Sequence, residues 1–161
     1  GTGMAHLFNY AGAPWLTQKW VRKVKAAYSD VTPYGGYRDD EDQGQMGALG
    51  VLMAIGLFEV DGGCAEKPFY EITSPLFDKV TIHLDNRYYP GKTFQIITVG
   101  NSADNMYIQR ASFNGKKWNK CWFYHEDFIK GGTLELQLGT TPNKKWGIEE
   151  FPPSSVSSDK D

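Results

Sequence analysis

The sequence predicts an α+β fold, and three observations lead to this class. The chain has 161 residues, which is enough for one domain of ordinary size. Before about Val60, apolar residues recur at spacings of three and four, as they do in amphipathic helices. After Asp61-Gly62-Gly63 they alternate with polar residues, as they do in β-strands. We therefore expect a helical part that is followed by a β part.

The first predicted helix runs from Pro14 to about Tyr28. Proline suits a first helical turn because the N–H group that it lacks has no helical partner there. Lysine and arginine separate the apolar residues of this segment, which are Trp15, Trp20, Val21, Val24 and Tyr28. The following residues, from Ser29 to Tyr37, are rich in turn formers and end the helix.

A second predicted helix runs from about Gln43 to Leu57 and is apolar nearly all round. A helix without a polar face is buried on every side. A segment of this length is too short to span a bilayer, which takes roughly 20 apolar residues. Its neighbours must therefore be protein, and the helical half is predicted to be part of a larger structure. The apolar residues are Met46, Ala48, Leu49, Val51, Leu52, Met53, Ala54, Ile55 and Leu57.

The β part is predicted to form an antiparallel sheet that belongs to a sandwich. The expected strands lie at residues 69–72, 80–84, 94–99, 106–110 and 134–138. Asn114-Gly115 is a strong signal for a two-residue hairpin turn. The residues from Phe151 onward are rich in proline, serine and charge, and are typical of a frayed terminus.

Composition excludes several classes of partner. The net charge of -2 and the pI near 5.9 argue against nucleic acid, because phosphate-binding proteins normally carry a basic face. No apolar segment is long enough to be a membrane span. Aromatic residues make up 14% of the chain, which is a weak hint of sugar binding, although an aromatic β-rich core is the more ordinary explanation. Cys64 and Cys121 lack metal-ligand spacing, so zinc is disfavoured, and we favour two free thiols over a disulfide.

Four acidic residues, Asp39-Asp40-Glu41-Asp42, stand just before the second predicted helix. The ordinary interpretation is an acidic helix start, because carboxylates are favoured at the positive end of the helix dipole. The functional interpretation is that like charges beside a buried helix attract a proton, a cation or a polar substrate. Neighbouring helical positions diverge by about 100°, so one carboxylate can face a pocket as a general base while others cap the helix. The pattern alone favours the ordinary interpretation and leaves the functional one open.

The three histidines show no catalytic arrangement. His83 alternates within a predicted strand, and His125 is expected in a loop before Phe128. Neither has a nucleophilic partner at a recognisable spacing, so structural or surface roles are expected for both. His6 lies near the start of the chain and could face a site built by residues outside it. No glycine-rich phosphate loop follows a strand, and nucleotide binding has no support.

Several motifs together resemble the C-terminal portion of glycoside hydrolase family 92, the calcium-dependent exo-acting α-mannosidases. They occur in the family's order from about His6 to Gly147. The motifs are Leu7-Phe8-Asn9-Tyr10-Ala11-Gly12, Pro14-Trp15, Thr17-Gln18, Asp40-Glu41-Asp42 before Gly44-Gln45-Met46, Gly56-Leu57-Phe58, Ser74-Pro75-Leu76-Phe77, Asn114-Gly115-Lys116 and Gly131-Gly132-Thr133-Leu134.

The resemblance implies a fragment of a larger enzyme. Family members join an N-terminal β-sandwich to an (α/α)6 barrel and are far longer than this chain. Residues 1–60 would then be closing helices of the catalytic barrel. Residues 61–150 would be an antiparallel, sandwich-like β segment, and residues 151–161 a flexible tail. The N-terminal remainder of the enzyme is the implied partner of this chain.

The resemblance also implies catalytic roles. Asp42 is the expected general base and Asp40 its helper, although other members can carry Asn where Asp40 stands. The general acid, a Glu, lies upstream of this region, so the chain alone is expected to be inactive. Calcium would hold the mannose O2 and O3, with ligands mostly outside this chain. The implied substrate is a glycan with terminal mannose, most often α-1,2-linked, and the implied location is extracellular or periplasmic. The alternative function is a non-catalytic carbohydrate-binding β domain.

Overall fold

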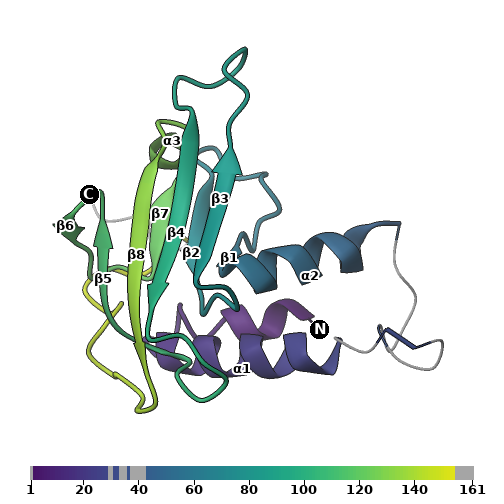
Figure 1. The fold of residues 1–161 in the computed structure, drawn as a ribbon, viewed down its shortest axis with the longest axis vertical. Coiled ribbons are helices and arrows are strands. Elements are labelled where there is room, and N and C mark those ends of the chain that lie inside the picture. The colour runs from purple at the N-terminus through teal and green to yellow at the C-terminus, as the bar shows by residue number, and fades with distance from the viewer. Residues whose placement is uncertain (1, 29–30, 33–35, 37–42, 155–161) are drawn as a thin grey trace.

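The protein is described by a computed structural model at residues 2–28, 31–32, 36 and 43–154. Two helices lie beside one another and next to two β-sheets, and α1 crosses the lower ends of the strands in the view of Figure 1. The α+β class is confirmed. The elements are η1 (Thr2–His6), α1 (Pro14–Ala27), α2 (Gln45–Ile55), β1 (Leu57–Phe58), β2 (Phe69–Ile72), β3 (Lys79–His83), β4 (Thr93–Val99), β5 (Tyr107–Phe113), β6 (Lys116–Lys117), β7 (Trp122–Tyr124), α3 (His125–Phe128) and β8 (Gly132–Gly139).

Helix α1 forms as predicted and carries polar residues on its buried side. Pro14 occupies its first turn, and Val21 is fully buried against α2 and η1. Gln18 is also buried, and its side-chain oxygen accepts a hydrogen bond of 2.9 Å from the backbone N–H of Ile108 in β5. The helix is therefore joined to the five-stranded sheet by a directed polar contact rather than by apolar packing alone.

Helix α2 is shorter than predicted and is not buried on every side. It ends at Gly56, whose φ of +83° is the left-handed conformation that glycine adopts at helix ends. Met46, Leu49 and Met53 are buried, whereas Val51 is 61% exposed. The reason is geometric, because the described residues contact α2 mainly from α1 and β1. The complete burial expected from its composition is therefore absent in this part of the protein.

The strands form two sheets, in the orders β1–β2–β7 and β3–β4–β8–β5–β6. The antiparallel prediction holds for most pairs but is wrong for β4 and β8, which run parallel. The cause is the position of β8, which enters between β4 and β5 after the chain has formed β6, β7 and α3. Because β4 and β5 point in opposite directions, any strand inserted between them must run parallel to one of them.

Local signals located most strands well. The strand at Phe69–Ile72 matches its prediction, and Asn114-Gly115 forms the turn between β5 and β6 with φ values of 50° and 76°. A type I′ hairpin turn requires positive φ values at both of these positions. His125 begins the short helix α3 instead of lying in a loop.

Aromatic residues fill the core between the two sheets. The ring of Phe94 lies 5.8 Å from Phe113, 5.6 Å from Phe123 and 4.8 Å from Phe128, measured between centroids. Such spacings are typical of stabilising aromatic pairs. The high aromatic content therefore largely serves the core, which was its ordinary explanation.

A second, smaller core joins η1, α1 and α2 through Ala5, Val21, Met46, Leu49 and Met53.

The two cysteines lie in different surroundings, and both are free thiols. Cys121 is buried, whereas Cys64 is exposed. The proposed division of the chain at residue 60 stays a prediction.

Candidate functional site

The two predicted catalytic residues, Asp40 and Asp42, lie outside the described residues, as does the rest of the acidic run. Gln43 and Gly44, which come directly after the run, adopt positive φ values of 57° and 96°, and α2 begins at the next residue. Gly44 is the N-cap and provides no side-chain hydrogen bond to the first turn. The acidic run thus ends, in sequence, at a helix terminus whose N–H groups favour negative charge.

A buried polar cluster lies where η1 meets the three-stranded sheet. We define it as His6, Asn9, Tyr10 and Glu71, of which His6, Asn9 and Glu71 have no exposed surface. Glu71 in β2 is paired with Phe58 in β1, so both side chains point to the same face of the sheet. The His6 ring stacks on Phe58 with centroids 3.7 Å apart.

Hydrogen bonds within the cluster converge on one carboxyl group. The side-chain amide of Asn9 donates to Oε2 of Glu71, and Tyr10 also hydrogen-bonds to this carboxyl. The Nδ1 atom of His6 lies 3.9 Å from the same oxygen. Burial raises the pKa of Glu71 to about 8 and lowers the pKa of His6 to about 3. At neutral pH the two residues therefore form a neutral pair rather than an ion pair.

The cluster cannot act directly on a substrate, because its acid and its imidazole do not reach the surface. Within the described part of the chain, both ring nitrogens of His6, Oδ1 of Asn9 and Oε1 of Glu71 are buried without a hydrogen-bond partner. Such atoms cost free energy, and half of the buried side-chain atoms without a partner in the described residues belong to this cluster. Sequence reasoning missed Glu71 as a site residue, since nothing local distinguishes it from an ordinary strand residue.

Arg22 connects α1 to two loops, the one that precedes β3 and the one that follows β4. Its Nε donates to the carbonyl of Ser74 at 3.1 Å and to the hydroxyl of the same residue at 3.0 Å. Its Nη2 donates to the carbonyl of Pro75 and, at 2.6 Å, to Oδ1 of Asn101. Its Nη1 donates to the carbonyl of Ser102 at 3.4 Å. All of these acceptors are neutral, and burial lowers the pKa of the guanidinium.

The other two histidines have the structural and surface positions that the sequence indicated. His83 is exposed on β3, and Nδ1 of His125 lies 3.0 Å from the hydroxyl of Tyr70. The ring of His125 also packs on Phe128, with centroids 5.9 Å apart.

A calcium ion does not fit the residues that the structure describes. No three His, Cys, Asp or Glu side chains gather among them in a group that could hold a metal ion. Calcium prefers six to eight oxygen ligands, including ionised carboxylates. The fully buried carboxyl of Glu71 is held neutral and is bonded to an amide, so it is not such a ligand. The calcium implied by the resemblance therefore has no assigned ligand.

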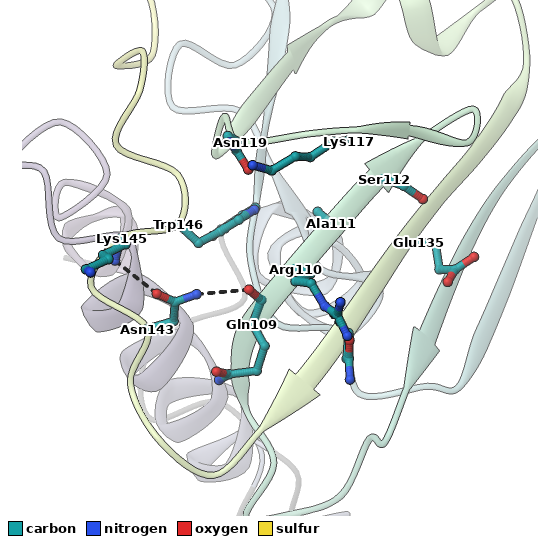
Figure 2. Close-up of a pocket in the computed structure, with 11 residues that line it drawn as sticks. Gln109, Arg110, Ala111, Ser112, Lys117, Asn119, Glu135, Asn143, Lys145 and Trp146 are labelled. Carbon is teal, nitrogen blue, oxygen red and sulfur yellow. Dashed lines mark hydrogen bonds between the residues drawn. The ribbon is translucent and has the colours of Figure 1, made fainter.

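A polar groove crosses the outer face of the five-stranded sheet (Figure 2). It has a volume of about 610 Å³ and lies over β5, β6 and β8, with the segment at residues 143–146 on its other side. Its lining residues are Gln109, Arg110, Ala111, Ser112, Lys117, Asn119, Glu135, Gln137, Asn143, Lys145 and Trp146. Most of them are polar, and sequence reasoning singled out none of them.

Comparison with known proteins assigns the chain to a family. The sequence profile of the glycosyl hydrolase family 92 catalytic domain matches residues 1–140, which include both long helices and both sheets. The chain belongs to glycoside hydrolase family 92. The resemblance indicated by the motifs is thereby confirmed, and the chain is a fragment of a family 92 catalytic domain.

Individual relatives support this assignment. An uncharacterized secreted glycosidase from Arthroderma benhamiae is 36% identical over 153 residues, which are 92% of this chain. The family 92 α-mannosidase BT3965 from Bacteroides thetaiotaomicron superimposes with a TM-score of 0.85 over 96% of this chain, at 29% identity. The family 92 inverting mannosidase BT2199 from the same species gives a TM-score of 0.81 over 93% of this chain, at 37% identity.

The chain spans only about a fifth of these relatives. It covers 19% of the Arthroderma glycosidase and 20% of each Bacteroides enzyme. None of the helices in its described part has the length and apolar character that crossing a bilayer requires.

Proposed function

We propose that this chain is the C-terminal part of an inverting, exo-acting α-mannosidase and that it supplies the general base. Membership of family 92 supports the glycosidase class. The observation that carries the proposal is the place of the acidic run in the sequence, because it ends two residues before Gly44, the N-cap of α2. An ionised carboxylate is favoured at that position, and a general base must be ionised at the working pH.

The two proposed catalytic residues have distinct roles. Asp42 activates the water that attacks the anomeric carbon, and Asp40 assists it. Inverting glycosidases hold their two carboxyl groups about 6.5–9.5 Å apart, so that water fits on one side of the sugar. The general acid comes from the preceding part of the enzyme, and the chain alone has no turnover.

The proposed partner of this chain is the N-terminal remainder of the enzyme, with α1 and α2 as closing helices of an (α/α)6 barrel. An apolar groove of about 540 Å³ supports this role, because it is lined by residues of η1, α2 and β1. Met4 and Leu7 in this groove are 66% and 52% exposed. Contiguous exposed apolar surface usually marks an interaction site, and here it fits helices from the same barrel.

The proposed substrate is a glycan with terminal α-linked mannose, with the α-1,2 linkage as the first choice. The names of the Bacteroides relatives, an α-mannosidase and an inverting mannosidase, support the sugar and the stereochemistry. The name of the Arthroderma relative, a secreted glycosidase, supports an extracellular or periplasmic location. A non-catalytic carbohydrate-binding domain is less well supported, because the catalytic-domain profile extends through both long helices.

The test is the substitution Asp42→Asn in the intact enzyme, with Asp39→Asn as the matched control. Loss of a general base lowers the rate by about 10²–10⁴-fold, so we expect a fall of that size in kcat on an α-mannoside. The control should keep most of its turnover, and both variants should have the same melting temperature as the parent enzyme. NMR of the first-formed product should show β-mannose. Full activity of the Asp42→Asn enzyme, or α-mannose as the first product, would contradict the proposal.

A further inference from the structure

We propose that the groove over β5, β6 and β8 binds a sugar that carries a phosphate monoester. The choice of a sugar rests on the proposed function, whereas the choice of a dianionic group rests on the groove itself. Three features of the groove support this ligand: the backbone that builds its walls, its excess of positive charge, and the polar groups that line it.

A β-bulge at Gln109 creates one wall of the groove. The register between β5 and β8 changes from Ile108 opposite Leu138 to Arg110 opposite Gln137, so Gln109 is an extra residue in β5. Side chains alternate along a strand, and without the extra residue Arg110 would share the buried face of Ile108. The bulge turns Arg110 to the outer face. Bulges often re-aim a side chain in this way next to functional sites.

The same bulge holds the opposite wall in place. The carbonyl of Gln109 accepts a hydrogen bond of 2.9 Å from the side-chain amide of Asn143, and Oδ1 of Asn143 accepts one of 3.0 Å from the N–H of Lys145 (Figure 2). These bonds fasten the segment at residues 143–146 to β5. Trp146, the last residue of this segment, is 3% exposed, and its indole N–H donates to the carbonyl of Trp118 at 3.0 Å.

The groove is positively charged although the chain is not. Three exposed cations, Arg110, Lys117 and Lys145, line it together with a single carboxylate, Glu135. The whole chain has a net charge of -2. A phosphate monoester carries about -1.5 to -2 at neutral pH, and it therefore matches the excess charge of the groove.

The polar groups favour an oxyanion that is attached to a hydroxylated body. The Nε of Arg110 donates to the side-chain oxygen of Gln137 at 2.8 Å, which fixes the guanidinium on the sheet. A fixed guanidinium suits phosphate oxygens, because its donors are planar and forked. The hydroxyl of Ser112 and the side-chain oxygen of Asn119 can hydrogen-bond to hydroxyls, whereas the Nδ2 of Asn119 already donates to Glu149 at 2.8 Å. The volume of about 610 Å³ is within the usual range for small-molecule sites, about 300–1,000 Å³.

Calorimetric titration of the intact enzyme with mannose 6-phosphate, mannose and inorganic phosphate tests this site. The variants are Arg110→Gln and Lys117→Gln. The control is Lys116→Gln, which removes the same charge from the neighbouring residue of β6 outside the groove. Loss of one charge-assisted contact should weaken mannose 6-phosphate binding by about tenfold or more in each groove variant. The control should bind like the parent enzyme, and mannose affinity should be the same in all of them.

Two results would overturn the proposal. The first is an affinity for mannose 6-phosphate that neither groove variant changes, with both variants folded as judged by their melting temperatures. The second is that inorganic phosphate binds as tightly as mannose 6-phosphate and is weakened equally by the two groove substitutions. This outcome would mean that the groove does not recognise the sugar. The titration is repeated in the Asp42→Asn enzyme. None of these ligands has a glycosidic bond that the enzyme could cleave, so the titration reports binding and not turnover. Equal mannose 6-phosphate affinity in the parent and in the Asp42→Asn enzyme makes a failure of this proposal distinguishable from a failure of the proposed base.

Discussion

The side-chain amide of Asn9 donates a hydrogen bond to the carboxyl group of Glu71, 62 residues later in the chain, and neither side chain has exposed surface. This contact joins the turn after η1 to strand β2. In the sequence, α1, the acidic run and α2 all lie between the two residues that it connects. The protonation state of one buried acid is therefore linked to the packing of the helices against the three-stranded sheet.

The first prediction concerns Glu71 at alkaline pH. Burial raises its pKa from the ordinary 4.5 to about 8, so its contribution to stability is complete below 4.5 and is lost as the pH rises towards 8. Glu71→Gln keeps the shape and cannot ionise. Urea unfolding should show the parent losing roughly 1.4 kcal/mol per pH unit between pH 6.5 and 8, while the variant stays flat. Glu126→Gln, at an exposed ion pair with Lys67, is the control and should follow the parent.

The second prediction concerns His6 at acidic pH. Burial lowers its pKa from the ordinary 6.5 to about 3, so its contribution to stability is complete above 6.5 and is lost as the pH falls towards 3. Between pH 4.5 and 6.5 the proton released by His6 on folding is matched by the one taken up by Glu71. The parent should therefore show a plateau there and a decline below 4.5. His6→Leu should remove the acid decline, and equal acid sensitivity of parent and variant would refute this assignment.

The third prediction concerns the polar connection made by Arg22. Arg22→Met leaves several partly buried carbonyl and amide oxygens without their donor, and should lower the free energy of unfolding by roughly 3 kcal/mol. Arg22→Lys should recover only part of the lost stability, because an ammonium group lacks the planar, forked donors of a guanidinium. Lys23→Met removes the same charge from a neighbouring position and should change stability by less than about 0.5 kcal/mol. Similar losses at both positions would mean that charge, rather than the hydrogen bonds, matters.

The fourth prediction compares two glycines of the α2 region. Gly56 has a φ of +83°, and a Cβ there would overlap the ring of Pro75. Gly56→Ala should therefore destabilise the fold by more than about 2 kcal/mol. Gly50 lies inside α2 with nothing within 4 Å of the position that a Cβ would take, and Gly50→Ala should stabilise by about 0.5–1 kcal/mol. Thermal melting of both variants distinguishes strain at Gly56 from a general effect of added methyl groups.

Local patterns were sufficient for most elements and insufficient for their arrangement. Helix α1 and strand β2 follow from periodicity, and the turn at Asn114-Gly115 follows from its backbone requirement. Strands β1 and β6 have two residues each, too few to show any period. The parallel pairing of β4 and β8 depends on a strand added late in the sequence, and no local signal encodes it.

For the candidate sites too, local sequence patterns indicate some residues and miss those that depend on tertiary contacts. The acidic run stands out in the sequence, yet Asp40 and Asp42 lie outside the described residues, and their roles stay predictions. Glu71 looks like any strand residue, because its burial comes from Asn9 and Tyr10 far away in the chain. The groove depends on the bulge at Gln109, which appears only when two strands are placed side by side.

The late entry of β8 has a consequence for how the molecule is made. On the ribosome, β4 and β5 leave the exit tunnel before the strand that separates them has been translated. Until residue 139 emerges, both carry unpaired edges that invite pairing with other nascent chains. The last strand of the sheet to be synthesised is thus its central one, and the five-stranded sheet can be complete only after β8 has emerged.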